Sequence, residues 1–180
     1  MFAGLSSWGG CGGIDRVMAV DDLSDEELYA KVSDRLIRFA ATIVGPADAE
    51  DVMTEGVVAA MRSRRWTRVD DRVAYLYRCV LNAGRMHLRA SGRRHRREDR
   101  VWRESHHQTS ADPAWGTVAS EVRSVVSSLS TRQRAVVYLT YWEDLDEATT
   151  ARLLGVSVGS VRQHLHRARH NIGRQLDATI

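Results

Sequence analysis

The sequence predicts an all-α protein with two small helical domains joined by a flexible linker. Apolar residues recur at intervals of three and four along most of the 180 residues, as on one face of a helix, and no stretch alternates between apolar and polar residues. A polar stretch of mixed charge at 97–111 interrupts this periodicity, and we predict that it links domains at 23–96 and 112–180. Residues 1–22 are rich in Gly and predict a flexible tail.

Charge is distributed unevenly along the chain, although the net charge is only +3. Residues 1–61 contain four basic and eleven acidic residues, net −7, whereas residues 62–100 contain thirteen Arg and four acidic residues, net +9. An acidic N-terminal stretch followed by a basic block indicates two different partners. Lys31 is the only Lys, and Arg binds phosphate bidentately, so the preference for Arg suits nucleic acid. The coding bias of a GC-rich genome explains the preference equally well.

The composition argues against several classes of protein. No apolar run approaches the ~20 residues that a membrane span needs, and the first residues lack the basic start and apolar stretch of a signal peptide. Cys11 and Cys79 lie in unlike contexts and predict no disulfide framework. We find no paired catalytic carboxylates, no nucleophile with a base and no Gly-rich phosphate loop. We therefore expect a cytoplasmic protein that is not an enzyme, with no cofactor, metal or membrane insertion.

Capping signals mark where two of the predicted helices begin. Ser24 with Glu27, and Ser130 with Gln133, have the spacing of a capping box, in which each side chain binds the backbone N–H of the other residue. The Gly-Pro pair at 45–46 ends the first helix, because Pro cannot continue it.

A short helix predicted at 47–61 has an acidic face. Asp48, Asp51 and Glu55 are spaced by three and four residues and therefore share that face. Like charges at these spacings destabilise an isolated helix by ~0.2–0.5 kcal/mol per pair. From the residues alone, the face is either solvated surface or a docking surface for a basic protein.

The basic block predicts a site for single-stranded nucleic acid. An Arg-rich connection at 62–72 contains Trp66 and leads into a helix in which Gly84 is unfavourable by ~1 kcal/mol relative to Ala, so we predict a bend or short loop at 82–84. Aromatic rings stack on exposed bases, an amide reads a base edge and Arg holds the backbone. A core helix followed by a solvated basic tail is the alternative. The candidate residues are Tyr75, Arg78, Asn82, Ala83, Gly84, Arg85, Arg89 and Arg93.

Residues 146–176 predict a helix-turn-helix. A first helix at 147–154 ends at Gly155, which tolerates the positive φ of a tight turn, and Ser157 can cap the second helix. The outer face of the second helix is polar and basic, as in a helix that enters the major groove. An αα-hairpin with a solvated basic face is the alternative. The candidate DNA-binding residues are Ser157, Ser160, Arg162, Gln163, His166 and Arg167.

Three segments together resemble the extracytoplasmic-function (ECF) group of bacterial RNA polymerase sigma factors. They are LIRFAATIVGPADAEDVMTEGVVAAM, AYLYRCVLNAGRMHLR and LSTRQRAVVYLTYWEDLDEATTARLLGVSVGSVRQHLHRAR, and in order they cover sigma regions two and four. The resemblance implies a protein that binds core RNA polymerase and directs promoter recognition and transcription initiation. It also implies an anti-sigma factor as a further partner.

The resemblance assigns roles to the three candidate surfaces. The D-A-E-D-x-x-x-E helix would dock on the clamp helices of the polymerase β′ subunit, and region four would contact the β flap. The loop at 82–85 would capture a flipped base of the minus-ten element, and the helix at 157–169 would read the minus-thirty-five element. The polymerase-binding residues would be Asp48, Glu50, Asp51 and Glu55.

The chain departs from the family pattern at three places. Tyr75 stands where Trp is usual, Met86 where an acidic residue is usual, and the segment 148–151 reads A-T-T-A in place of E-E-I-A. The promoter sequence therefore cannot be carried over from the family.

Two other functions compete with the sigma-factor interpretation. A stand-alone helix-turn-helix repressor or activator would explain the second domain but not the acidic helix. A metal-dependent nuclease would use His164, His166 and His170, although no Cys or acidic ligand accompanies them nearby.

Overall fold

The computed structural model describes residues 23–102 and 128–177, and in this part of the chain it contains helices and no strand. The all-α prediction is therefore confirmed. The tail predicted at 1–22 and the start of the second domain at Asp112 lie outside the described residues. The elements are α2 (Asp25–Val44), α3 (Ala49–Met61), the 3₁₀ turn η1 (Trp66–Arg68), α4 (Arg72–Trp102), α6 (Thr131–Tyr141), α7 (Glu147–Leu154) and α8 (Val158–Asp177).

The helix boundaries follow the capping signals in the sequence. Ser24 Oγ accepts a hydrogen bond from the Glu27 N–H, and the Glu27 carboxylate accepts one from the Ser24 N–H at 2.9 Å. These hydrogen bonds favour the charged carboxylate and lower the pKa of Glu27. Gly45, at φ +95°, ends α2. The second predicted capping box, Ser130 with Gln133, is also present.

Helices α2, α3 and α4 form one unit, in which two glycines permit close packing. A Cβ at Gly56 of α3 would lie 2.7 Å from the Cα of Val80 in α4, so a larger residue would push the two helices apart. A Cβ at Gly84 of α4 would lie 2.8 Å from Cγ2 of Ile43 in α2. Both glycines are buried and let backbones approach where a side chain would collide.

The bend or loop predicted at 82–84 is wrong, because α4 continues as a helix from Arg72 to Trp102. The physical reason is tertiary. Gly84 costs helix stability when considered alone, but here it is the residue that lets α4 cross α2 at Ile43. The same helix also extends through residues 97–102, into the stretch predicted as a linker.

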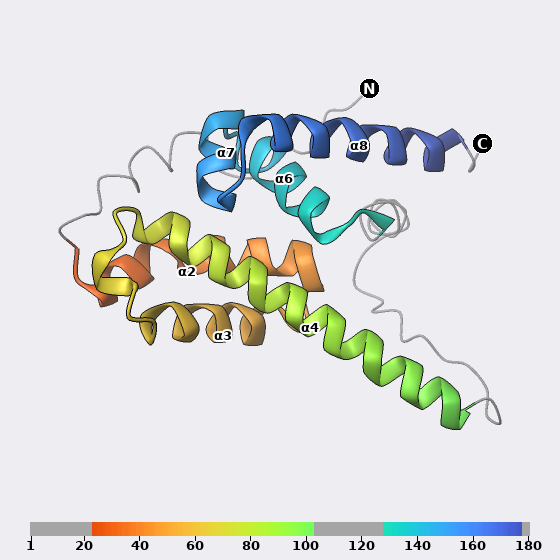
Figure 1. Cartoon of the computed structure of the whole chain (residues 1–180), viewed down its shortest axis with the longest axis horizontal. Coiled ribbons are helices and arrows are strands. Elements are labelled where there is room, and N and C mark those ends of the chain that lie inside the picture. Colours follow the sequence, from red (N-terminus) through yellow and green to blue (C-terminus); the bar gives the residue numbers. More distant parts are fainter. Residues whose placement is uncertain (1–22, 103–127, 178–180) are drawn as a thin grey trace.

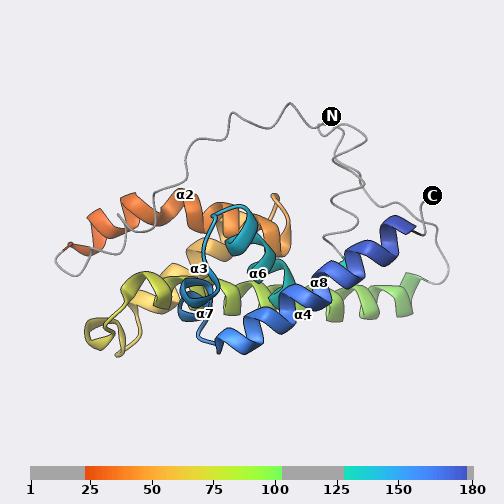
Figure 2. The same ribbon diagram turned by 90° about the horizontal axis from the view of Figure 1, so that it is seen from above.

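Helices α6, α7 and α8 form a second unit that lies over the first (Figures 1 and 2). The two units share a continuous apolar core in which α6 packs on α2 and α7 packs on α4. Phe39 of α2 lies at its centre, with ring centroids 5.0 Å from Tyr77 of α4 and 5.8 Å from Tyr138 of α6. This contact between the units was not predicted from the sequence.

Candidate nucleic-acid and protein interfaces

Local hydrogen bonds shape the turn between α7 and α8 as the sequence predicted. Asp146 Oδ1 accepts a hydrogen bond from the Thr149 N–H at 2.7 Å and caps α7, which lowers the pKa of Asp146. Gly155 ends α7 in the left-handed conformation, at φ +64°. Ser157 Oγ then accepts a hydrogen bond from the Ser160 N–H at 3.1 Å and caps α8. The predicted helix-turn-helix geometry is therefore present.

Helix α8 has a buried face and an exposed basic face. Val161, Leu165 and Ala168 are buried against α6 and α7. The opposite face is open to solvent, apart from Ser160, which is half-buried. The exposed candidates are Ser157, Arg162, Gln163, His166 and Arg167. These side chains can therefore reach a groove of DNA without any rearrangement of the unit.

Two contacts hold basic side chains of α8 against neighbouring elements. Arg162 Nε donates to Glu147 Oε2 of α7 at 2.6 Å, while 69% of the Arg162 side chain stays exposed. Arg169 donates to the Tyr141 hydroxyl at 2.6 and 2.9 Å and lies over its ring. Glu147 and Tyr141 thus orient two cations near the candidate DNA-binding face.

Thr150 occupies the position in α7 where the family usually has an apolar residue. It is fully buried, and its hydroxyl has no hydrogen-bond partner among the described residues. A buried hydroxyl without a partner costs ~1–3 kcal/mol. The departure noted in the sequence is therefore a weak point in the packing of the helix-turn-helix.

The acidic face of α3 is largely open to solvent. Glu50, Asp51 and Glu55 are exposed, and Asp48 is half-buried with its carboxylate 3.2 Å from His87 Nε2 of α4. Val58, 39% exposed, continues the same side of the helix. The structure therefore brings two uncovered carboxylates, Asp51 and Glu55, and the apolar side chain of Val58 together on one face, as a docking surface for a basic partner would require, whereas Glu50 is exposed on a neighbouring side of the helix.

Six of the residues expected to bind single-stranded nucleic acid lie in the middle of α4 and fall into three groups. Asn82 and Arg89 are exposed and Arg85 is half-buried, and their spacing places them on one side of the helix. Ala83 and Gly84 are buried in the packing of α4, so their side chains are not available to a ligand in this arrangement. The side chain of Arg93 lies outside the described residues.

The remaining two candidates, Tyr75 and Arg78, contact each other, and Arg78 also reaches the second unit. The Tyr75 hydroxyl is 3.0 Å from Ser63 Oγ, and the Arg78 guanidinium lies over the Tyr75 ring at 5.9 Å from its centroid. Arg78 also passes beneath the turn of the helix-turn-helix, since a Cβ at Gly155 would lie 2.8 Å from its Cδ. Neither side chain is fully exposed.

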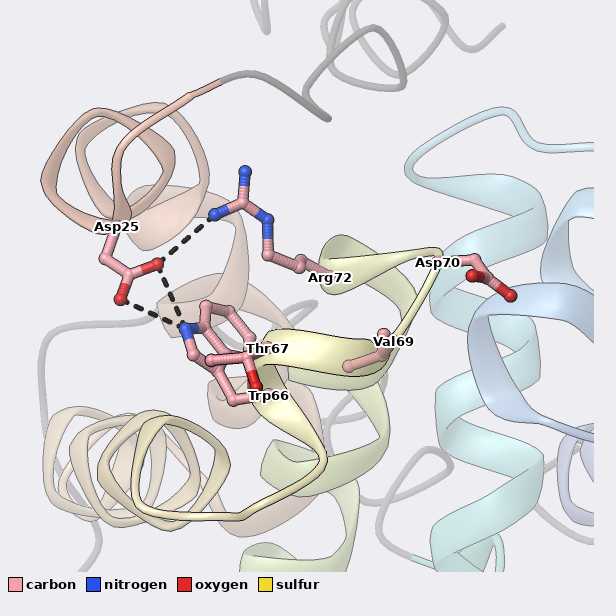
Figure 3. Close-up of a pocket in the computed structure, with 6 residues that line it drawn as sticks. All are labelled: Asp25, Trp66, Thr67, Val69, Asp70 and Arg72. Carbon is pink, nitrogen blue, oxygen red and sulfur yellow. Dashed lines mark hydrogen bonds and ion pairs between the residues drawn. The ribbon is translucent and has the colours of Figure 1, made fainter.

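A polar pocket between the start of α2 and the connection that joins α3 to α4 was not predicted as a site. It has a volume of about 490 Å³ and is lined by Asp25, Trp66, Thr67, Val69, Asp70 and Arg72 (Figure 3). The indole Nε1 of Trp66 donates to both carboxylate oxygens of Asp25 at 3.0 Å, and Arg72 Nη1 lies 3.2 Å from the same carboxylate. The signal in the sequence was the Arg-rich connection itself, which has Trp66 and two adjacent Asp but no apolar periodicity.

Three features limit what the pocket can bind. The Trp66 ring is buried, whereas Thr67 and Asp70 are exposed and offer hydrogen-bonding groups. Asp70 points away from the Asp25–Trp66–Arg72 cluster (Figure 3). The connection that lines the pocket also carries four exposed arginines, namely Arg62, Arg64, Arg65 and Arg68. Exposed polar groups on a connection rich in cations suit a ligand that combines hydrogen-bonding edges with phosphate.

The histidines of α8 were weighed as metal ligands, and their surroundings in the structure do not support a metal site. Within residues 23–102 and 128–177, no group of three His, Cys, Asp or Glu is placed to hold a metal ion. His166 and His170 are exposed, and His164 is half-buried, which lowers its pKa because burial disfavours the charged imidazolium. No helix in the described part of the chain is long and apolar enough to cross a membrane.

Comparison with known families matches both units. Residues 28–94 match the model of sigma-70 region 2, and residues 119–172 match that of sigma-70 region 4. The chain is 32% identical over 162 residues to the RNA polymerase sigma-E factor of Streptomyces coelicolor, covering 87% of this chain and 88% of the relative. It is 29% identical to the ECF RNA polymerase sigma factor SigM of Mycobacterium tuberculosis, covering 88% of this chain and 80% of the relative.

Two solved structures share the fold. One is the sigma factor RpoE in complex with the anti-sigma factor NepR from Bartonella quintana, with a TM-score of 0.62, 20% identity and coverage of 84% of this chain and 96% of that one. The other is CnrH in complex with the cytosolic domain of CnrY, with a TM-score of 0.58, 24% identity and coverage of 91% of this chain and 94% of that one.

The competing interpretation, a stand-alone helix-turn-helix regulator, would explain the match to region 4 but not the match to region 2. The chain belongs to the ECF group of RNA polymerase sigma factors, which direct transcription initiation.

Proposed function

We propose that the acidic face of α3 binds the clamp helices of the β′ subunit of core RNA polymerase. The proposal is supported by the exposure of Asp51 and Glu55 beside Val58, with Glu50 exposed on a neighbouring side, because carboxylates steer a basic partner and an apolar side chain anchors it. The protein works in the cytoplasm, where the polymerase is found, and performs no covalent chemistry of its own. The β flap is the second polymerase element, bound by the α6–α8 unit.

The exposed face of α8 binds the minus-thirty-five element in the major groove. Arg162 and Gln163 can pair with base edges, and Ser157 with the α8 N-terminus can bind phosphate. Glu147 holds Arg162 Nε at 2.6 Å, which leaves the two terminal nitrogens of the guanidinium for DNA.

The melted minus-ten element is bound by α4 together with the Arg-rich connection that precedes it. Along α4, Asn82, Arg85 and Arg89 remain the contacts proposed from the sequence, with Arg93 continuing the series in sequence. The pocket at Thr67 and Asp70 takes the place of the predicted loop at 82–85 as the receptor for an unstacked base. Its exposed arginines would hold the phosphates on either side.

An anti-sigma factor is a further proposed partner. Support comes from the two similar solved structures, one a sigma factor in complex with an anti-sigma factor and the other CnrH in complex with the cytosolic domain of CnrY. An apolar groove of about 360 Å³ between α2 and α3, lined by Tyr29, Val57, Val58 and Met61, offers a surface for an amphipathic helix.

The observation that carries the proposal is the presence, in one chain, of an uncovered acidic helix and an uncovered basic recognition helix. Transcription in vitro with core polymerase on a library of genomic promoters tests it. The purified chain should direct initiation from a subset of promoters that share two elements. Initiation no different from that of core polymerase alone would contradict the proposal.

A further inference from the structure

Tyr141 and Arg169 make a polar contact at the edge of the basic face of α8. Tyr141 is the last residue of α6, and its hydroxyl accepts hydrogen bonds from Nε and Nη2 of Arg169 at 2.9 and 2.6 Å. The Arg169 guanidinium also lies over the Tyr141 ring, 5.9 Å from the ring centroid. Neither residue was among the DNA-binding residues expected from the sequence. The contact fixes the guanidinium relative to α6 as well as to α8.

This contact leaves hydrogen-bond donors and positive charge available to a ligand. A hydroxyl that accepts a hydrogen bond keeps its own proton to donate, and the N–H groups on Nη1 of Arg169 are not used by Tyr141. Tyr141 is 52% exposed, and Arg169 is exposed as well. The two side chains therefore present adjacent donors and a cation to solvent, a combination that suits an anion.

Arg162 and Arg169 differ in the kind of partner that holds them. Glu147 is charged and partly neutralises Arg162, whereas the Tyr141 hydroxyl is neutral. Within residues 23–102 and 128–177, no carboxylate pairs with Arg169. The positive charge of Arg169 is therefore uncompensated in this part of the chain, as a site for a phosphate oxygen requires.

The position of Arg169 on α8 relates it to bound DNA. Arg169 follows Arg162 by almost two helical turns, so both lie on the same side of α8, ~10.5 Å apart along its axis. The N-terminal part of a recognition helix contacts base edges, and the major groove is about 12 Å wide. If Arg162 contacts a base edge, Arg169 reaches the backbone that borders the groove.

A purely structural role explains the contact less well. The two helices already pack through Val161, Leu165 and Ala168, which are buried on the side of α8 that faces α6 and α7 (Figures 1 and 2). An exposed hydrogen bond adds little to such packing. Holding the helices together also gives no reason for an unmatched charge.

We propose that Tyr141 and Arg169 bind one backbone phosphate of the DNA held by α8. Arg169 supplies the charge, and Tyr141 positions the guanidinium and donates its own hydroxyl. This inference rests on the proposed binding of the minus-thirty-five element by α8. A phosphate contact carries no sequence information, however, so the pair acts equally on DNA of any sequence.

The salt dependence of DNA binding by the full-length chain tests the proposal. The probes are a labelled minus-thirty-five duplex, taken from a promoter found by transcription in vitro, and a duplex of the same composition in scrambled order. Arg169→Ala should weaken binding to both duplexes about tenfold and reduce the slope of log affinity against log salt by about 0.9. Tyr141→Phe should weaken both about threefold with the slope unchanged, because the charge remains. Lys31→Ala, an exposed cation on α2, is the charge-matched control and should change neither quantity.

A scan with single methylphosphonates, each of which removes the charge of one phosphate, locates the contact on DNA. In the wild type, neutralisation of one phosphate at the border of the minus-thirty-five element should cost about as much affinity as Arg169→Ala does. In the Arg169→Ala chain, neutralisation of that same phosphate should cost nothing further. Equal losses at every phosphate in both chains would contradict a contact between Arg169 and a particular phosphate.

Circular dichroism establishes that each variant keeps its helices, and Arg169→Gln, which removes the charge but keeps a donor, serves if Arg169→Ala does not fold. An unchanged salt slope in a folded variant without the charge overturns the proposal. So does a loss of core polymerase binding with DNA binding intact, because the pair would then contact protein. If the wild type bound the two duplexes equally, the proposed role of α8 would fail, and the salt slopes on the scrambled duplex would still decide whether Arg169 contacts phosphate.

Discussion

The helix-turn-helix and the middle of α4 differ in what determines their conformation. In α7 and α8, Asp146, Gly155 and Ser157 act on backbone groups within a few residues of themselves. In α4, Gly84 is locally unfavourable for a helix, yet the helix continues because the missing Cβ gives room to Ile43. Local hydrogen bonding therefore decides the first region, and contact between distant segments decides the second.

The strongest test of this contrast replaces Gly84 by Ala. Helix propensity alone predicts a gain of ~1 kcal/mol. The structure predicts instead a net loss of ~1–3 kcal/mol, because the new Cβ would lie 2.8 Å from Cγ2 of a fully buried Ile43. Urea denaturation measures the difference in unfolding free energy. Gly173→Ala in α8 is the matched control, since no atom lies within 4 Å of its Cβ position, and it should stabilise. Equal stabilisation by both substitutions would show that packing does not decide the path of α4.

The role of the helix-turn-helix is tested by removing the side chains of α8 that are proposed to contact DNA. Arg162→Ala and Arg167→Ala should each weaken binding to a minus-thirty-five duplex by about 1–3 kcal/mol if they contact bases, and should reduce the salt dependence if they contact phosphate. Both side chains are exposed, so the fold should be unaffected. Fluorescence anisotropy at several salt concentrations distinguishes the two kinds of contact. Unchanged affinity in both variants would remove α8 as the recognition helix.

Thr150 is a position at which the packing of the helix-turn-helix is unfavourable. Thr150→Val keeps the shape and removes a buried hydroxyl that has no partner among the described residues, so it should stabilise the fold by about 1 kcal/mol. The control is Thr149→Val, at a half-buried position one residue earlier. Thermal unfolding of the two variants gives the comparison. If Thr150→Val destabilised the fold, the Thr150 hydroxyl would have to make a hydrogen bond that is absent from this structure.

The smallest effect is expected at Glu147. Its ion pair with Arg162 is short at 2.6 Å but largely solvent-exposed, and exposed pairs contribute between zero and about 1 kcal/mol. Glu147→Gln should therefore change the unfolding free energy by less than about 0.5 kcal/mol, whatever it does to DNA binding. A larger loss in thermal unfolding would mean that the turn depends on side-chain charge as well as on its caps.

The sequence predicted those features whose causes lie within a few residues. The capping boxes at Ser24 and Ser130 and the turn at Gly155 depend on short-range hydrogen bonds, and all are present. The acidic face of α3 follows from helical spacing alone. The continuity of α4 could not be predicted, because it depends on a contact between Gly84 and Ile43, which are far apart in the sequence.

The pocket and the contact between the two units were missed for the same reason. The pocket needs Asp25 at the start of α2 beside Trp66 and Arg72, and the contact between the units needs Arg134 of α6 beside the Ile43 carbonyl in the last turn of α2. No periodicity or spacing pattern brings such residues together. The Arg-rich connection was visible in the sequence, but its role as the wall of a pocket appears only once the helices are packed.

The central claim is that the acidic face of α3 attaches the chain to the transcription machinery independently of the DNA-binding surfaces. The most direct measurement is the affinity of fluorescent protein for core RNA polymerase at low salt, compared between the wild type, Asp51→Arg/Glu55→Arg and the control Asp34→Arg, an exposed acid on α2. Reversal of two docking charges should weaken polymerase binding by about 10- to 100-fold, with minus-thirty-five duplex binding retained and the control unaffected. A double variant that binds core polymerase as tightly as the wild type would contradict the claim.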